Sequence, residues 1–156
     1  MYGRLLFLLL SCPGVLGGCL YTPDADGHVT VPDGVEQLED GAFNSCTSLV
    51  SITLPDGMTS LGTYAFQFCA SLVSVTLPDS LASIGLGAFY DCTALASITL
   101  PDGLASLGDS AFAGCTSLAS ITLPDGLASI GYAAFRYCSS LALVYVPTGC
   151  SVGTQA

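Results

Sequence analysis

The most reactive side chains of this sequence recur at a fixed interval. Five of the eight cysteines follow one another at steps of 23 residues. Zinc needs four ligands that converge on one point, whereas a constant step produces a line of side chains. Parallel chains also hold adjacent Cβ atoms about 4.8 Å apart, beyond the roughly 3.8 Å that a disulfide prefers. We therefore expect no metal and no bridge in this series, and interpret its members as buried thiols that act as small hydrophobic residues: Cys46, Cys69, Cys92, Cys115 and Cys138.

A second series at the same interval consists of carboxylates. Each aspartate follows a proline, and most precede a glycine, which is the chemistry of a turn. Calcium takes about six to eight oxygen ligands, and each unit offers one carboxylate at this place. We expect a structural turn rather than a calcium site at Asp33, Asp56, Asp79, Asp102 and Asp125.

Other signals for catalysis or for binding of nucleic acid are weak. His28 is the only histidine, and neither Ser45 nor Cys46 stands with it in a spacing typical of a nucleophile and its base. We therefore expect no catalytic residues and no cofactor. The net charge is −10, with two lysine or arginine residues in all. Since nucleic acid is bound by neutralising its phosphates, it is excluded as a partner.

The first residues have the pattern of a targeting segment. A short start with Arg4 precedes the apolar run 5–10 and the small residues 13–18, which is typical of a secretory signal. A spanning helix needs roughly 20 unbroken apolar residues, and Pro13 interrupts this run, which argues against a membrane anchor. An anchor and a buried end cap are the alternatives to the signal. Residues 16–19 also resemble a lipoprotein processing site, in which Cys19 would carry a lipid. If Cys12 and Cys19 leave with the signal, Cys150 is the odd thiol.

These side chains are positioned by an internal repeat. Prolines and phenylalanines share the step of 23 residues without a gap, and such a period indicates stacked units. We divide the chain into a signal segment 1–20, an N-terminal half-repeat 21–45, four repeats 46–137 and a decaying repeat 138–156. The repeated positions are Pro32, Pro55, Pro78, Pro101, Pro124 and Pro147, with Phe43, Phe66, Phe89, Phe112 and Phe135.

One repeat predicts two extended pieces and one turn. Residues 120–123 alternate between hydroxyl and aliphatic side chains, the period of a strand with one buried face, and Pro124 ends that strand. A second extended piece carries Leu127 and Ile130. Phe135 and Cys138, three residues apart, predict a short helical or 3-10 turn. A unit of this size buries too little surface to fold alone, so we expect parallel, in-register ladders.

The recurring pattern C-x-x-L-x-x-I-x-L-P-x-x-L-x-x-I-G-x-x-A-F-x-x, over residues 29–146, resembles the BspA-type, or Treponema-type, leucine-rich repeat. The resemblance implies a β-rich right-handed solenoid, secretion or cell-surface display, and non-catalytic binding or adhesion to a protein or cell-surface ligand. Glu39 replaces the repeated glycine, Thr148 the aspartate and Cys150 the leucine. Such drift is expected of capping units or of a fragment from a longer array.

Positions that change between repeats gather around the predicted turn. They include aromatic residues and one arginine, the residue types enriched in binding hot spots. Ordinary loop drift is the alternative explanation of this variation. We predict a convex or lateral protein-binding edge formed by Tyr64, Phe68, Tyr90, Tyr132, Arg136 and Tyr137.

The outward strand face predicts a different surface, an uncharged hydroxyl grid. Its regularity would suit ice or a carbohydrate. Leu143 and Tyr145 break the grid in the last repeat, where an exposed strand edge favours pairing with another copy. End-to-end self-association and a structural, self-assembling surface role are therefore further hypotheses. The grid consists of Ser51, Ser74, Ser97 and Ser120, with Thr53, Thr76, Thr99 and Thr122.

Overall fold

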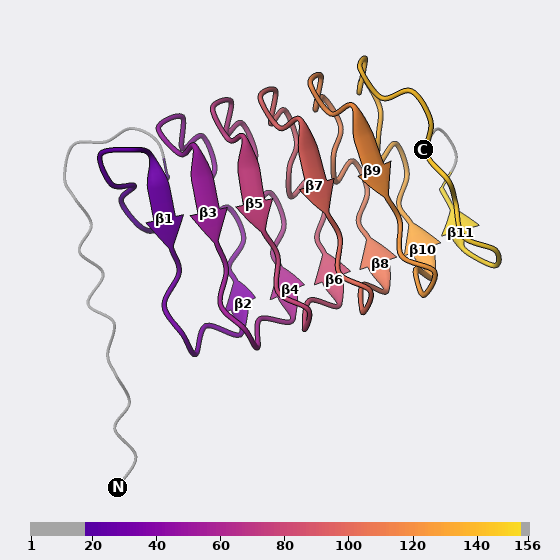
Figure 1. Cartoon of the computed structure of the whole chain (residues 1–156), viewed down its shortest axis with the longest axis horizontal. Helices are drawn as coiled ribbons and strands as arrows, with labels where there is room; N and C mark the ends of the chain where they lie inside the picture. Colours follow the sequence, from indigo (N-terminus) through magenta and orange to yellow (C-terminus); the bar gives the residue numbers. More distant parts are fainter. Residues whose placement is uncertain (1–17, 154–156) are drawn as a thin grey trace, which may run out of the picture.

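The computed structural model describes residues 18–153, which form one stack of coils around an apolar interior (Figure 1). The longer strands line one face: β1 (His28–Thr30), β3 (Ser51–Thr53), β5 (Ser74–Thr76), β7 (Ser97–Thr99) and β9 (Ser120–Thr122). The shorter strands line a second face: β2 (Gln37–Leu38), β4 (Ser60–Leu61), β6 (Ser83–Ile84), β8 (Ser106–Leu107), β10 (Ser129–Ile130) and β11 (Ser151–Val152). The segment 1–17 of the expected signal lies outside the described residues.

The strands pair in parallel and in register with the repeat. In β7 and β9, Ile98 lies beside Ile121, a step of one 23-residue unit, so the predicted solenoid with parallel ladders is confirmed. The last pairing is shorter: Ile130 lies beside Val152, and the final coil thus lacks one residue on the second face.

The alternation of side chains explains the first face. Ile121 points inward and is buried, whereas Ser120 and Thr122 on either side are exposed, as a period of two requires. A backbone hydrogen bond closes the turn that follows such a strand. After β3, for example, the Met58 amide donates to the Pro55 carbonyl at 3.3 Å. None of the described structure's hydrogen bonds involves a carboxylate of the repeated aspartates.

The third segment of each coil corrects the prediction of a short helical or 3-10 turn. No helix occurs in the described residues; single turns alternate with bonds to the next coil. The Tyr90 amide closes a turn onto the Gly87 carbonyl at 2.9 Å. The amides of Phe89 and Asp91 on either side donate to carbonyls of the following coil, at 2.8 Å each. The spacing of three between Phe and Cys reflects one such turn.

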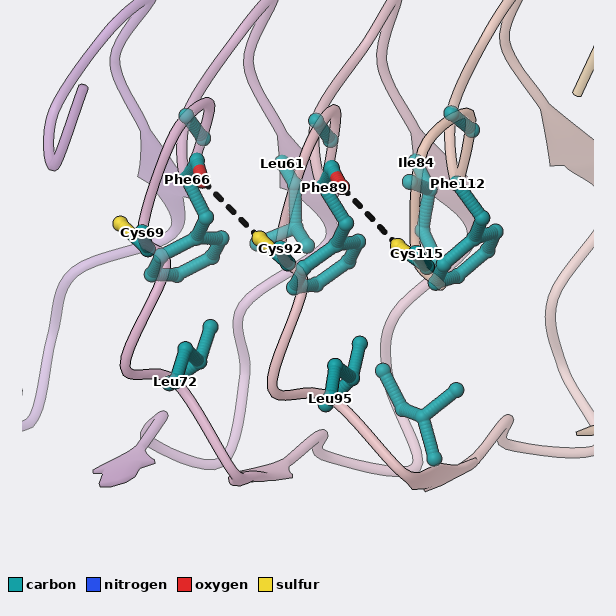
Figure 2. Close-up of a cluster of buried hydrophobic side chains, with 14 of the residues drawn as sticks. Leu61, Phe66, Cys69, Leu72, Ile84, Phe89, Cys92, Leu95, Phe112 and Cys115 are labelled. Atoms are coloured by element: carbon teal, nitrogen blue, oxygen red, sulfur yellow. Dashed lines mark hydrogen bonds between the residues drawn. The ribbon is translucent and has the colours of Figure 1, made fainter. Parts of the chain in front are cut away.

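A column of phenylalanine rings forms the centre of the core (Figure 2). The Phe66 and Phe89 ring centroids are 5.1 Å apart with an interplanar angle of 10°, and Phe89 and Phe112 are also 5.1 Å apart. These rings are fully buried. Because parallel coils repeat at about 4.8 Å, identical side chains in register can stack face to face, and the step of 23 is held by this contact.

A column of glycines lets successive coils approach closely. A Cβ added to Gly85 would lie 2.7 Å from the Leu61 carbonyl oxygen, and one added to Gly108 would lie 2.6 Å from the Gly85 carbonyl carbon. Both distances are shorter than van der Waals contact. In the first coil the equivalent position is Glu39, which is exposed. Since no described coil precedes it, a side chain there meets no backbone, and this explains the departure from the repeat.

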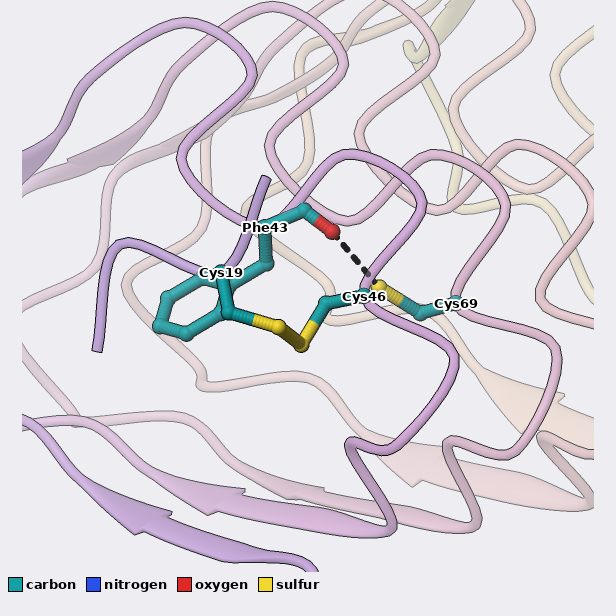
Figure 3. Close-up of a disulfide and its surroundings, with 4 residues drawn as sticks. All are labelled: Cys19, Phe43, Cys46 and Cys69. Atoms are coloured by element: carbon teal, nitrogen blue, oxygen red, sulfur yellow. Dashed lines mark hydrogen bonds between the residues drawn. A yellow bond between two sulfur atoms is a disulfide. The ribbon is translucent and has the colours of Figure 1, made fainter. Parts of the chain in front are cut away.

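The N-terminal end of the stack is covered by residues 18–21 and corrects two sequence interpretations (Figure 3). Cys46 is not a free thiol: it forms a disulfide with Cys19, with Cα atoms 5.1 Å apart. The bridge uses the sulfur that a lipid on Cys19 would need, so the lipid hypothesis is wrong for this structure. The amides of Gly18 and Leu20 donate to the Asn44 and Ala42 carbonyls.

That covering segment differs from a coil. The amide of Gly18 donates to Asn44, whereas the amide of Leu20, two residues later, donates to Ala42, two residues earlier than Asn44. The two segments therefore run antiparallel. Tyr21 continues the aromatic column, with its ring centroid 6.2 Å from that of Phe43. The apolar interior is therefore closed at this end.

Candidate binding surface

Three of the six predicted edge residues, Tyr64, Phe68 and Tyr137, occupy left-handed backbone positions, of which every coil has two. At the first position stand Gly41, Tyr64, Gly87, Ser110 and Ala133, and at the second stand Ser45, Phe68, Asp91, Gly114 and Tyr137, all with φ between 54° and 76°. This conformation favours glycine, and a bulky side chain there costs on the order of 1 kcal/mol. The glycines at Gly87 and Gly114 show that the fold accepts glycine in both positions.

One part of the edge is an aromatic cluster on the repeats 46–68 and 69–91, which we call the first cluster: Tyr64, Phe68 and Tyr90. The rings of Phe68 and Tyr90 meet edge to face, with centroids 5.8 Å apart and an interplanar angle of 86°. A Cβ on Gly87 would lie 2.6 Å from Cδ1 of Tyr64, so Gly87 leaves room for the Tyr64 ring to lie across the next coil. Phe68 remains 42% exposed.

The other part, which we call the second cluster, lies on the repeat 115–137: Tyr132, Arg136 and Tyr137. The Arg136 guanidinium carbon is 4.6 Å from the Tyr137 ring centroid, within the range of a cation–π contact. Tyr137 is 66% exposed and Tyr132 44%. The Tyr132 amide donates to an Asp109 carboxylate oxygen at 2.7 Å, which fixes the backbone at the base of this cluster.

Small residues separate the two clusters. The intervening repeat, 92–114, has Ser110, Ala113 and Gly114 at the edge positions, and Ala113 and Gly114 are buried. One coil between the clusters corresponds to about 10 Å between the coils that carry them. The structure thus brings together Tyr64, Phe68 and Tyr90, and separately Arg136 and Tyr137, rather than all six residues in one line.

The cysteine column has a structural role in the described coils. Each thiol donates to the phenylalanine carbonyl of the preceding coil, as from Cys92 to Phe66 and from Cys115 to Phe89 at 3.1 Å (Figure 2). Burial raises the pKa of the Cys69 thiol to about 12 and that of Cys138 to about 11. Neutral, buried thiols are poor nucleophiles, and the interpretation of Cys69, Cys92, Cys115 and Cys138 as free buried thiols is confirmed.

Sequence reasoning missed the Cys19–Cys46 pair because its separation of 27 residues departs from the period. A signal was present in the column itself. Every later cysteine donates to a phenylalanine carbonyl 26 residues before it, and no phenylalanine stands 26 residues before Cys46. The first thiol therefore needed a different partner.

Members of the carboxylate and hydroxyl series, among them Thr53, Asp56 and Asp79, line an open hollow of about 350 Å³ over the first coils. The repeated aspartates are all exposed, and no group of three or more possible metal ligands occurs among the residues that the structure describes. The hydroxyl face is divided, because β1, β3 and β5 form one hydrogen-bonded sheet and β7 and β9 another. His28 contacts Ser51 through Nδ1 at 2.7 Å and Thr30 through Nε2 at 3.2 Å.

Comparison with known proteins agrees with this arrangement of fixed inner columns and varying turns. Six copies of the BspA type Leucine rich repeat region match residues 25–151. The chain belongs to the BspA-type leucine-rich repeat family. No curated protein matches it.

Solved structures of leucine-rich repeat proteins and of a pneumococcal antigen share the fold. A Treponema pallidum leucine-rich repeat protein is 35% identical with a TM-score of 0.76, covering 81% of this chain and 69% of that one. A leucine-rich cell surface protein of Faecalibacterium prausnitzii is 31% identical with a TM-score of 0.74, covering 85% and 33%. The pneumococcal vaccine antigen PcpA is 26% identical with a TM-score of 0.68, covering 83% and 32%. This chain thus spans about a third of the latter two.

In this BspA-type chain the repeat fixes the residues that face inward and leaves the left-handed turn positions free to vary. The phenylalanine, cysteine and glycine columns each contact the neighbouring coil. The side chains of Phe68 and Tyr137 face outward instead. Repeat proteins of this kind offer extended surfaces for binding. In the described residues no helix could span a membrane.

Proposed function

We propose that this chain is a secreted or surface-displayed, non-enzymatic protein that binds a protein ligand in adhesion or recognition, through the two aromatic clusters. The observation that carries the proposal is the backbone at Tyr64, Phe68 and Tyr137, with φ of 55°, 60° and 63°. Large aromatic residues occupy conformations that glycine adopts at lower cost. Residues that lower stability in this way are commonly retained for function.

The chemistry of the clusters fits a protein ligand. Exposed tyrosine and phenylalanine supply rigid contact area, and Arg136 is the one arginine or lysine among residues 18–153. Tyrosine and arginine are enriched at the energetic centres of protein interfaces. The rest of the described surface is rich in carboxylates, so an acidic segment of a ligand would be attracted to the second cluster and repelled elsewhere.

Replacement of the clusters by glycine tests the proposal. Phage that display random peptides are selected on the wild-type chain, and the recovered clones are measured on Phe68→Gly/Tyr137→Gly. We expect binding to fall about tenfold or more, while the melting temperature is kept or rises, because glycine relieves the left-handed strain.

Thr99→Lys is the matched control, since Thr99 is exposed on the strand face away from the turns. Clones that bind the glycine variant as tightly as wild type, or that lose affinity only on Thr99→Lys, contradict the proposal. The second outcome supports adhesion through the hydroxyl face to ice or a carbohydrate. Thermal hysteresis of wild type compared with Thr99→Lys then distinguishes ice from a carbohydrate.

Secretion is proposed with one change to the expected signal boundary. The proposed signal ends before Cys19 rather than at residue 20, since Cys19 holds the first coil through its disulfide. Disulfides persist in oxidising compartments. Intact mass of the exported protein is expected to include Cys19 and to lack the two hydrogens of one disulfide. A mature chain that begins after Cys19 would contradict this.

A further inference from the structure

The two strand faces of the stack differ at one internal boundary, between the repeats 69–91 and 92–114, which we call the joint. On the second face, one hydrogen-bonded sheet crosses the joint and runs from β2 to β11. On the first face, β5 and β7 are neighbours in the stack (Figure 1), yet β5 ends one sheet and β7 begins another. The first face is therefore interrupted at the joint.

A backbone hydrogen bond that joins other coils of the first face is absent at the joint. Just before β5, the Val73 amide donates to the Val50 carbonyl at 2.8 Å. Just before β9, the Ala119 amide donates to the Ala96 carbonyl at 3.1 Å. The equivalent bond at the joint would run from the Ala96 amide to the Val73 carbonyl, and it does not occur in the described structure.

Packing is also looser at the joint. Val75, at the centre of β5, is half-buried, whereas Ile52 and Ile98 in the neighbouring strands are 1% and 6% exposed. Leu77, just after β5, is half-buried as well. Its amide makes no hydrogen bond to the following coil, although the amide of Leu54 makes one at 3.2 Å. Valine is smaller than isoleucine by one methylene, so the inner column is incompletely filled here.

The same two coils remain joined along their other segments. On the second face, the Gly108 amide donates to the Ile84 carbonyl at 2.8 Å. In the turn segment, the amides of Phe89 and Asp91 donate to the following coil at 2.8 Å each, and the Phe89 ring stacks on that of Phe112. Contacts that persist on two sides of a boundary and fail on the third define an axis about which the two parts can rotate.

The turn of the repeat 69–91 is tied to the coil before it. Ser80 stands where the neighbouring repeats have Gly57 and Gly103. Its hydroxyl accepts a hydrogen bond from the Gly57 amide at 3.0 Å and donates one to the Met58 carbonyl at 2.8 Å. No hydrogen bond of the described structure joins residues 78–81 to the next turn, 101–104. The end of β5 is therefore held on the side away from β7.

We propose that the joint is a hinge, at which residues 92–153 rotate as one body relative to residues 18–91. The axis follows the second face and the turn segment, so β5 and β7 move apart and together, and Val75 and Ser80 keep the first face open. Motions of this kind take microseconds to milliseconds. If both aromatic clusters bind one ligand, as proposed above, the hinge sets the angle between them, because the joint lies between the repeats that carry them.

Amide hydrogen exchange followed by NMR tests the joint with a control inside the chain. Ala96 and Ala119 both follow a leucine and precede a serine, so their intrinsic exchange rates are equal. Because only the Ala119 amide is bonded to a neighbouring coil, we expect Ala96 to exchange at least about a hundredfold faster. Relaxation dispersion, which detects motion in microseconds to milliseconds, is expected at Val75, Leu77 and Ala96 and not at Gly108.

Val75→Ile/Ser80→Gly gives the repeat 69–91 the residues of the repeats on either side. We expect this variant to pair β5 with β7, to slow exchange at Ala96 at least about tenfold, and to abolish the dispersion. Ala94→Ser is the matched control. It also restores the residue of other repeats, such as Ser71, but lies outside the strands of the first face, and it is expected to leave exchange and dispersion unchanged.

Three outcomes would count against the hinge. Equal exchange at Ala96 and Ala119 overturns it. Dispersion at Gly108 as strong as at Ala96 also overturns it, since the whole coil would then open rather than rotate. Unchanged exchange at Ala96 in Val75→Ile/Ser80→Gly overturns the role of these two residues. The measurements contain no ligand, so their failure leaves the proposed function of the aromatic clusters to its own test.

Discussion

The two ends of the coil stack differ in what covers the same apolar columns. At the N-terminal end, an antiparallel segment lies on the first coil, Tyr21 extends the phenylalanine column, and Cys19 ties the segment to Cys46. At the C-terminal end, Phe135 is half-buried and Leu143 and Tyr145 are exposed. Among the described residues, the same repeated unit is thus covered in the first coil and more exposed in the last one.

The glycine column provides the largest test of this difference. Gly108→Val places a side chain where a Cβ alone would lie 2.6 Å from the Gly85 carbonyl carbon and the Leu86 amide nitrogen. Backbone atoms of a paired coil cannot move aside, so we expect a loss of more than about 4 kcal/mol of unfolding free energy. Urea unfolding followed by circular dichroism measures it.

Glu39→Val is the control for that experiment, since Glu39 occupies the same column in the first coil and is exposed. We expect its unfolding free energy to stay within about 0.5 kcal/mol of wild type. Equal losses at positions 39 and 108 would mean that a side chain in the first coil also meets a neighbour, and the contrast between ends and interior would be wrong.

Removal of the disulfide tests the closed end directly. Cys19→Ala/Cys46→Ala releases a bridge between residues 27 apart, and we expect a loss of about 3 kcal/mol, mainly through the greater freedom of the unfolded chain. Hydrogen exchange is expected to rise at the Gly18 and Leu20 amides and to change little in the repeat 92–114. A uniform rise over all coils would contradict local closure of the N-terminal end.

The sequence was sufficient for the repeated part of the structure and insufficient at its ends. A step of 23 residues predicts which side chains share a column, because parallel stacking brings identical positions together. It does not predict contacts outside the period, such as Cys19 with Cys46. The spacing of Phe135 and Cys138 suggested a helical turn, since one turn of either kind brings residues three apart onto one side.

The residue types of the candidate edge were predicted from the sequence, but their arrangement in space was not. Variation among repeats identified Tyr64, Phe68 and Tyr137, yet the left-handed backbone at these residues becomes evident only when they are aligned with Gly87 and Gly114 in three dimensions. The division into two clusters depends on the small side chains of one repeat. The contacts within each cluster depend on rotamers, which a pattern of residue types does not specify.

The thiol column offers the smallest test and contrasts its first member with the others. Burial raises the pKa of Cys69 from an ordinary value near 9 to about 12, so the folded state favours the neutral thiol. The stabilisation is complete below pH 9 and is lost as the pH rises toward 12, because the unfolded chain ionises first. Between pH 8 and pH 10 we expect Cys69→Ala to reduce the alkaline loss of unfolding free energy by about 1.4 kcal/mol. Cys46 stands in the same column but is oxidised and does not titrate, so Cys19→Ala/Cys46→Ala should show the full wild-type pH dependence. Urea unfolding at the two pH values, without reductant, measures both variants. An equal alkaline loss of unfolding free energy in the two variants would refute the assignment.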